Sequence, residues 1–135
     1  MPLMTWNNDL SVNIKEIDSQ HKKLVDLINE LHDEMMAYKG KDVLGKVLSE
    51  LLSYTKTHFF TEEKIMNSNG YPAYLTQKQE HDKLTKKVAE LKNEFDAGKI
   101  VLGTEVMKFL KDWLTNHIMK SDKAYTPFLN SKGIF

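Results

Sequence analysis

The sequence predicts an all-α protein, an antiparallel up-down-up-down four-helix bundle with an N-terminal arm. Three observations support this prediction: apolar residues recur every three or four positions, the periodic stretches are long, and glycine or proline separates them. Helices of about 20 residues joined by loops of a few residues must lie antiparallel. The 135 residues suffice for one buried core, so we expect one domain that covers residues 1–135.

The first predicted helix spans Ser19–Tyr38. Asp18 precedes it as a candidate N-cap, and Gly40 follows it as a stop signal. Its apolar face repeats every three or four residues and consists of Leu24, Ile28, Leu31 and Met35. Before this helix lies the predicted arm, and we expect Trp6 to fix the arm across the bundle.

The second predicted helix begins at about Val43, with Asp42 as a possible cap. The Asn69-Gly70-Tyr71-Pro72 segment ends it, because glycine and proline together favour a turn. Polar residues interrupt its apolar face, which consists of Val47, Leu48, Leu51, Leu52, Thr55, His58, Phe59, Glu62, Ile65 and Met66. A buried imidazole or carboxylate needs a partner, so this interruption requires an explanation.

The third predicted helix spans Ala73–Ala97 and stops at Gly98. The fourth begins near Gly103 or Thr104. Its buried side consists of Val106, Phe109, Leu110, Trp113, Leu114, His117 and Ile118. Beyond it we expect a short non-helical tail over Tyr125–Phe135.

Composition argues against several classes of function. The 19 basic residues, all lysine, balance 19 acidic ones, so the chain lacks the basic face and the arginines typical of nucleic-acid binding. No apolar run approaches the roughly 20 residues of a membrane span. The sequence has no cysteine, which leaves only nitrogen and oxygen ligands for a metal. We expect a cytoplasmic protein with no membrane or nucleic-acid partner.

Two pairs of ligand-type residues have informative spacings. His58 and Glu62 lie four residues apart, so one face of an α-helix directs both to the same point. His117 and Asp122 lie five apart and converge only if the helix ends or loosens between them. Pro127 favours this interpretation, because proline stops regular helix soon afterwards.

The other helices each offer one histidine on the apolar face. His21 precedes the first apolar face by one turn, and His81 has the same position in the third helix. In an antiparallel bundle these histidines and the two pairs lie at one end, which predicts a site for two metal ions. A ligand set of imidazole and carboxylate favours iron or manganese over structural zinc. His32 lies about 16 Å from His21 along the axis, so it is expected to be a partly exposed residue outside the site.

The chain resembles the hemerythrin family, specifically its single-domain bacteriohemerythrins. The resemblance covers nearly the whole chain and depends on three motifs: Glu16-Ile-Asp-Ser-Gln-His21, His58-x-x-x-Glu62 and His117-x-x-x-x-Asp122. It implies a non-haem centre of two iron ions, bridged by carboxylates and an oxo or hydroxo group, that binds dioxygen reversibly. It also implies that Glu62 and Asp122 bridge the irons. The implied histidine ligands are His21 and His58 for one iron, and His81 and His117 for the other.

The chain departs from the family at one position. The third helix of the family carries His-x-x-x-His, whereas this sequence has Gln77 four residues before His81. An amide oxygen is a weaker ligand than an imidazole nitrogen. Three states are open at this point: Gln77 binds metal through oxygen, water takes its place, or the coordination position stays vacant.

Apolar residues near the predicted ligands have two interpretations. Leu24, Phe59, Trp113, Leu114 and Ile118 lie within a turn of a ligand, where they either line a water-excluding pocket for a bound gas or serve only as core. Tyr125 follows Asp122 by three residues, so it is expected either to pack on the site or to hydrogen-bond near it.

We therefore expect a monomeric di-iron protein that stores, delivers or senses dioxygen. Gln77 motivates a first alternative, a di-iron enzyme that acts on peroxide or nitric oxide at an accessible second iron. The second alternative is an iron-binding bundle without gas chemistry. The expected partner is dioxygen or another small diatomic molecule or peroxide.

Overall fold

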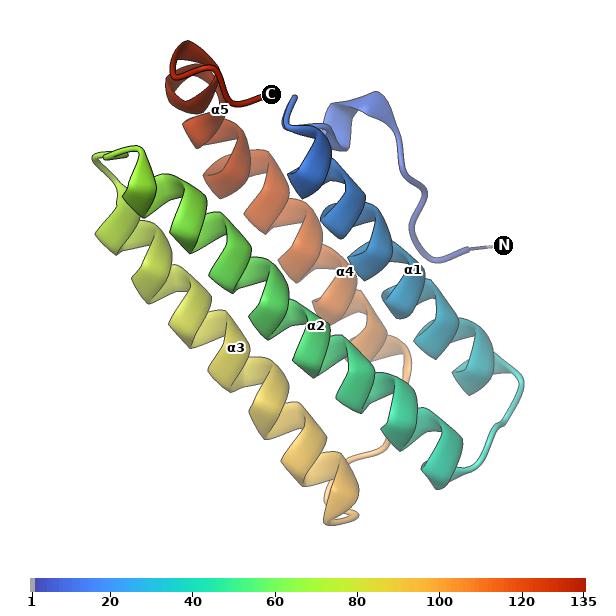
Figure 1. The fold of residues 1–135 in the computed structure, drawn as a ribbon. Helices are drawn as coiled ribbons and strands as arrows, with labels where there is room; N and C mark the ends of the chain where they lie inside the picture. Colours follow the sequence, from blue (N-terminus) through green and yellow to red (C-terminus); the bar gives the residue numbers. More distant parts are fainter. Residues whose placement is uncertain (1) are drawn as a thin grey trace.

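The computed structural model describes residues 2–135 and contains no β-strand in that range. Its long helices run alternately up and down (Figure 1). They are α1 (Lys15–Met36), α2 (Lys41–Ser68), α3 (Tyr74–Asp96) and α4 (Thr104–Asn116). The chain continues from α4 through a π-helical segment, η2 (His117–Asp122), into α5 (Lys123–Ser131). The predicted all-α antiparallel four-helix bundle is confirmed.

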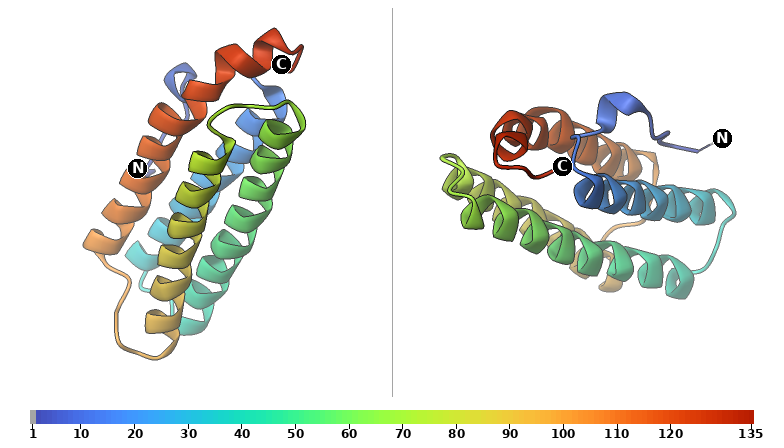
Figure 2. Two further views of the ribbon diagram at one scale, coloured as in Figure 1. Left: turned by 90° about the vertical axis from the view of Figure 1, so that its left-hand side faces the viewer. Right: turned by 45° about the horizontal axis from the view of Figure 1, so that its top comes forward.

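Apolar side chains from all four long helices fill the space between them. Figure 2 shows α5 bending across one end of the bundle. The fully buried aliphatic residues include Leu24, Ile28, Leu31, Leu48, Leu51, Leu110 and Ile118. Burial of this apolar area is the main favourable contribution to folding. Within residues 2–135, no helix is both long and apolar enough to cross a membrane.

The boundaries of the four long helices agree with the predictions to within a few residues. The first helix ends at Met36 and not at Tyr38, because Tyr38 takes the left-handed conformation (φ 56°) at the turn. Gly40 instead serves as the N-cap residue of α2, so the prediction of Asp42 as its cap is wrong: Asp42 lies in the first turn. Gly98 behaves as predicted: it adopts a φ of 74° after α3, which glycine tolerates without steric cost.

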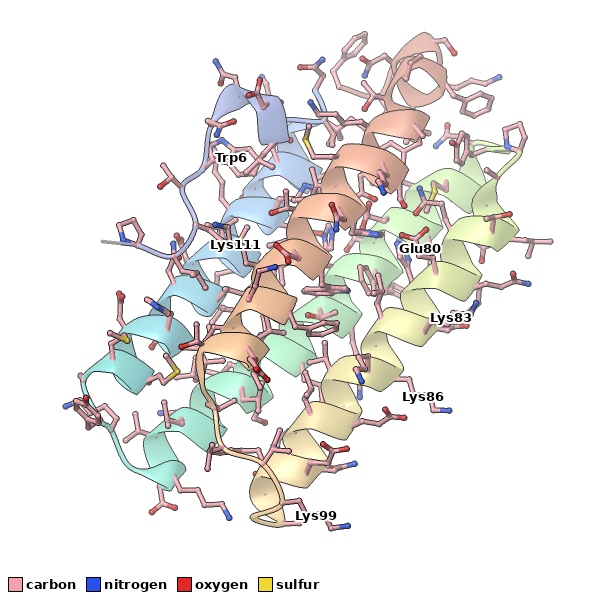
Figure 3. The ribbon with its side chains drawn as sticks, turned by 180° about the vertical axis from the view of Figure 1, so that it is seen from behind. Trp6, Glu80, Lys83, Lys86, Lys99 and Lys111 are labelled. Carbon is pink, nitrogen blue, oxygen red and sulfur yellow. The ribbon has the colours of Figure 1, made fainter. Side chains whose placement is uncertain are left out.

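The predicted role of Asp18 as an N-cap is wrong. The first helix begins earlier, at Lys15, so Asp18 lies inside its first turn. Its carboxylate accepts hydrogen bonds from the Val12 N–H at 2.8 Å and the Ser11 hydroxyl at 2.6 Å. Asp18 therefore fixes the arm to the helix. Trp6, labelled in Figure 3, is partly buried against the core. The Lys22 ammonium lies over its ring.

The predicted non-helical tail is also wrong, because α5 continues through Pro127 to Ser131. Proline removes one backbone donor from the helix, but tertiary contacts hold the segment in place. Tyr125 and Leu129 are each only 1% exposed. The Thr126 hydroxyl donates to the Val12 carbonyl at 2.8 Å, which ties the C-terminal segment to the arm.

We predict that Asn29→Ala lowers the free energy of unfolding by about 1–2 kcal/mol. The Asn29 side chain accepts from the Met4 N–H at 2.8 Å and donates to the Met4 carbonyl at 2.9 Å, so the variant leaves two backbone groups of the arm unpaired. Urea denaturation of the metal-free protein measures the change. Asn93→Ala, at an exposed position of α3, is the control and should cost nothing. Equal stability of both variants would contradict the assigned role of Asn29.

Candidate metal centre

The π-helical segment brings His117 and Asp122 to one face. A π-helix bonds each N–H to the carbonyl five residues earlier, and here the Lys123 N–H bonds to the Ile118 carbonyl. Residues five apart therefore point in similar directions. The His117 Nε2 atom lies 3.1 Å from Asp122 Oδ1. The expected loosening of the helix between them is confirmed.

One group of potential ligands contains His21, His58, Glu62 and Asp122. One ligand atom of each lies within 4.8 Å of all the others, and all four residues are buried. The His58 Nε2 atom lies 2.7 Å from Glu62 Oε1, and the His21 Nε2 atom lies 2.9 Å from Asp122 Oδ2. This group joins α1 and α2 to the end of η2.

A second group contains Glu62, His81, His117 and Asp122 within the same 4.8 Å limit. The Nε2 atoms of His81 and His117 each lie 3.7 Å from Glu62 Oε1. Glu62 and Asp122 thus belong to both groups, with two imidazoles on either side. The structure brings all six predicted nitrogen and carboxylate residues together. His32 stays outside and half-buried, as expected.

The donor atoms fit metal ions better than they fit one another. The four inward Nε2 atoms, Glu62 Oε1 and both Asp122 oxygens are buried, yet none has a hydrogen-bond partner within residues 2–135. Two ligands at right angles about a metal, each about 2.1 Å from it, lie about 3 Å apart. The close N···O distances of the site are of this size. Nitrogen and oxygen donors around two shared carboxylates are the ligands of di-iron carboxylate proteins.

Gln77 is buried beside this site. It is 4% exposed, and its amide nitrogen donates to the Ser121 carbonyl at 2.5 Å. Its Oε1 atom is buried and has no hydrogen-bond partner in the part of the chain that the structure describes. The hydrogen bond from the Gln77 amide nitrogen to Ser121 thus leaves the amide oxygen available to bind a metal ion.

The geometry can be compared with known proteins. Residues 12–129 match the family model described as Hemerythrin HHE cation binding domain. The chain belongs to the hemerythrin family. It is 39% identical to the Bacteriohemerythrin of Methylococcus capsulatus over 97% of this chain and all of that protein. It is also 39% identical to a Bacteriohemerythrin of Pseudomonas aeruginosa, over 93% of this chain and 80% of that protein.

Solved structures agree with this membership. A crystal structure of wild-type hemerythrin superimposes with a TM-score of 0.87 at 40% identity, over 94% of this chain and 98% of that one. The resemblance inferred from the three motifs is therefore confirmed. Hemerythrins hold a non-haem di-iron centre, and this chain has the groups of histidine and carboxylate needed to hold one.

Three residues that were not predicted from the sequence orient three of the four ligand imidazoles. The Nδ1 atoms of the histidines lie 2.7–3.0 Å from Gln20 Oε1 for His58, from Glu63 Oε2 for His81, and from Glu80 Oε1 for His117. A partner that only accepts fixes the proton on Nδ1, so the Nε2 lone pair points inward. A sequence signal existed: each supporting residue is adjacent to a predicted ligand on the preceding helix.

Tyr125 contacts the shared carboxylate directly. Its hydroxyl donates to Glu62 Oε2 at 2.8 Å, and its side chain is 1% exposed. Of the two roles expected for Tyr125, packing on the site or hydrogen bonding near it, the structure shows the hydrogen bond. Because Oε1 of Glu62 faces the histidines while Oε2 accepts from Tyr125, the carboxylate plane is fixed.

The apolar neighbours of the site are all buried. They are Leu24, Phe59, Trp113, Leu114 and Ile118. The Phe59 ring stacks on the His81 ring with centroids 3.9 Å apart, and it meets the His117 and Trp113 rings edge-on. Phe59 therefore covers the histidines of the second group, and Trp113 packs against Phe59.

Burial and charge divide the protons among the ligands. Burial lowers the pKa of His21 to about 4, and it also lowers the pKa of His81. Burial opposes ionisation of Glu62, but His58 and His117 outweigh it and hold the pKa of Glu62 well below its usual value. Burial and the charge of Glu62 raise the pKa of Asp122 well above its usual value. A metal ion must displace the protons bound to its ligand atoms. Metal affinity therefore decreases as the pH decreases.

We predict that metal-free protein loses stability on acidification in a way that depends on His21. Between pH 6.5 and 4 the unfolded chain binds a proton that buried His21 excludes, so the free energy of unfolding falls as the pH falls. The difference in pKa corresponds to about 3 kcal/mol. Urea denaturation across this range should give a shallower pH dependence for His21→Gln. His32→Gln, at a half-buried position outside the site, should keep the parent slope; a parent slope in both variants would refute the prediction.

Proposed function

We propose that this hemerythrin binds dioxygen reversibly at a non-haem di-iron centre, and thereby stores, delivers or senses oxygen. The observation that carries this proposal is the pair of buried ligand groups that share Glu62 and Asp122. Relatives at 39% identity over most of their length are bacteriohemerythrins. When bound, such a centre supplies two electrons that can be passed reversibly to dioxygen.

We assign one iron position to each group of ligands. His21 and His58 would hold the first iron, His81 and His117 would hold the second, and Glu62 and Asp122 would serve both positions. The short distances from His21 to Asp122 and from His58 to Glu62 support the first assignment. An iron held by these two imidazoles and two carboxylates would supply the position at which a small ligand binds.

We assign Gln77 as the remaining ligand of the second iron, through its Oε1 atom. Its amide nitrogen is bonded to the Ser121 carbonyl, next to the ligand Asp122. Reversing the amide would place the oxygen against this carbonyl and lose the hydrogen bond. Of the three states that the sequence leaves open, oxygen ligation therefore has the best support. Ligation by the Gln77 oxygen also disfavours an accessible second iron. The alternative function, an enzyme that acts on peroxide or nitric oxide, depends on such access.

The apolar residues around the ligands support a carrier more than an enzyme with a polar substrate. We propose that Leu24, Phe59, Trp113, Leu114 and Ile118 exclude water from the centre and from any bound gas. The monomeric state and the cytoplasmic location stay predictions.

We predict a reversible optical cycle for the iron-loaded protein. Anaerobically reduced protein should gain visible charge-transfer absorption on exposure to oxygen, lose it when oxygen is removed, and regain it on a second exposure. His58→Ala removes a ligand of the first iron and should abolish the cycle. An irreversible change to the di-ferric spectrum in the parent protein would refute the carrier function and favour redox catalysis or simple iron binding.

We predict that Gln77→Leu weakens metal binding about 10-fold or more, whereas Gln77→His retains two metal ions per chain. Leucine removes both the oxygen donor and the bond to Ser121, while histidine supplies an imidazole at the same position. Titration of metal-free protein with Co²⁺ measures affinity and stoichiometry. Gln79→Leu, at an exposed position of the same helix, is the control. Unchanged affinity in Gln77→Leu would show that Gln77 is not a ligand.

A further inference from the structure

The outer nitrogens of the ligand histidines have unequal partners. His81 and His117 each face a carboxylate, Glu63 at 2.8 Å and Glu80 at 3.0 Å. His58 faces the neutral amide of Gln20, and His21 Nδ1 has no hydrogen-bond partner among residues 2–135. Both charged partners therefore support the histidines of one ligand group, the second group, to which we assign Gln77.

We propose that Glu63 and Glu80 are positioning residues whose negative charge makes His81 and His117 stronger donors, which compensates the second metal position for its weaker Gln77 ligand. This inference rests on the assignment of two metal positions in the proposed function. A carboxylate that accepts the Nδ1 proton makes imidazole a more basic donor, and outer partners of this kind typically contribute 10–100-fold to metal affinity. The two remaining imidazoles of the second position are thus strengthened where the third donor is a weaker amide oxygen.

The position of Glu80 shows that its side chain is held in place. Its Oε1 atom accepts from both His117 Nδ1 and the Ser121 hydroxyl, the latter at 2.6 Å. Figure 3 shows Glu80 on the side of α3 that faces α4. The Ser121 carbonyl also accepts a hydrogen bond from the Gln77 amide nitrogen. One residue of the π-helical segment therefore orients both the weak ligand and the charge that compensates for it.

Glu63 supports His81 of α3 from the neighbouring helix α2. Its side chain is 18% exposed, so water screens its charge only in part. Lys78 approaches the other carboxylate oxygen at 3.8 Å and is itself 44% exposed. The hydrogen bond to His81 is the shorter contact, which directs the negative charge of Glu63 toward the metal position.

Glutamine variants separate charge from orientation. Glu63→Gln and Glu80→Gln keep an acceptor for Nδ1 but remove the charge. In a Co²⁺ titration of metal-free protein, we expect each variant to weaken one binding step about 10-fold or more. That step should be the one that Gln77→Leu weakens, and the other step should be unchanged. Glu90→Gln, at an exposed position of α3, is the matched control and should leave both steps at the parent values.

Two further measurements extend the test beyond affinity. Removal of a negative charge disfavours the ferric state, so both glutamine variants should raise the midpoint reduction potential of the iron-loaded protein. Gln20→Glu adds a carboxylate behind His58 and should strengthen the other Co²⁺ step. In a Gln77→His background, the loss caused by Glu80→Gln should be offset, because a third imidazole replaces the weak donor.

Parent-like affinity and potential in both glutamine variants, with losses only in Glu63→Ala and Glu80→Ala, would overturn the proposal, since orientation alone would then explain the contacts. Equal weakening of both metal steps would also overturn it. The proposed function fails separately: a parent protein that binds two Co²⁺ ions and responds as expected to the glutamine variants, yet shows no reversible oxygen cycle, would retain this inference and lose the carrier function.

Discussion

Two carboxylates buried side by side are the constraint on which the rest of this structure depends. Glu62 and Asp122 are at most 1% exposed, in a bundle whose interior is otherwise mainly apolar. An ionised carboxylate is costly to bury without compensating charge or hydrogen bonds, and two adjacent ones repel each other. Four surrounding histidines and the Tyr125 hydroxyl reduce this cost, and two shared metal ions would remove most of it.

The π-helical segment follows from this constraint. A regular α-helix would direct His117 and Asp122 about 140° apart, so one of them would miss the site. The wider helix places both beside Glu62 and also presents Ser121 to α3. Polar contacts from Gln77 and Glu80 to Ser121 thus hold α3 against η2 at the depth of the metal centre.

A regular pattern of support links each helix to the next. Gln20 of α1 contacts His58 of α2, Glu63 of α2 contacts His81 of α3, and Glu80 of α3 contacts His117. Successive residues on a helix differ by about 100°, so a residue adjacent to an inward ligand faces the neighbouring helix. The bundle therefore uses pairs of adjacent residues, one as ligand and one as support. A change of charge in a support alters a metal position without altering its ligands.

The sequence by itself determined the helical periods, the loop positions, the four-residue spacing of His58 and Glu62, and the family. These features depend on local geometry, which spacing and turn residues report directly. The sequence misplaced Asp18 and the C-terminal tail, because Asp18 bonds to the arm and tertiary contacts keep α5 helical past Pro127. Only the tertiary structure decided the orientation of Gln77 and the partners of the outer histidine nitrogens. Those contacts join different helices, so the angle and depth at which the helices pack determine them.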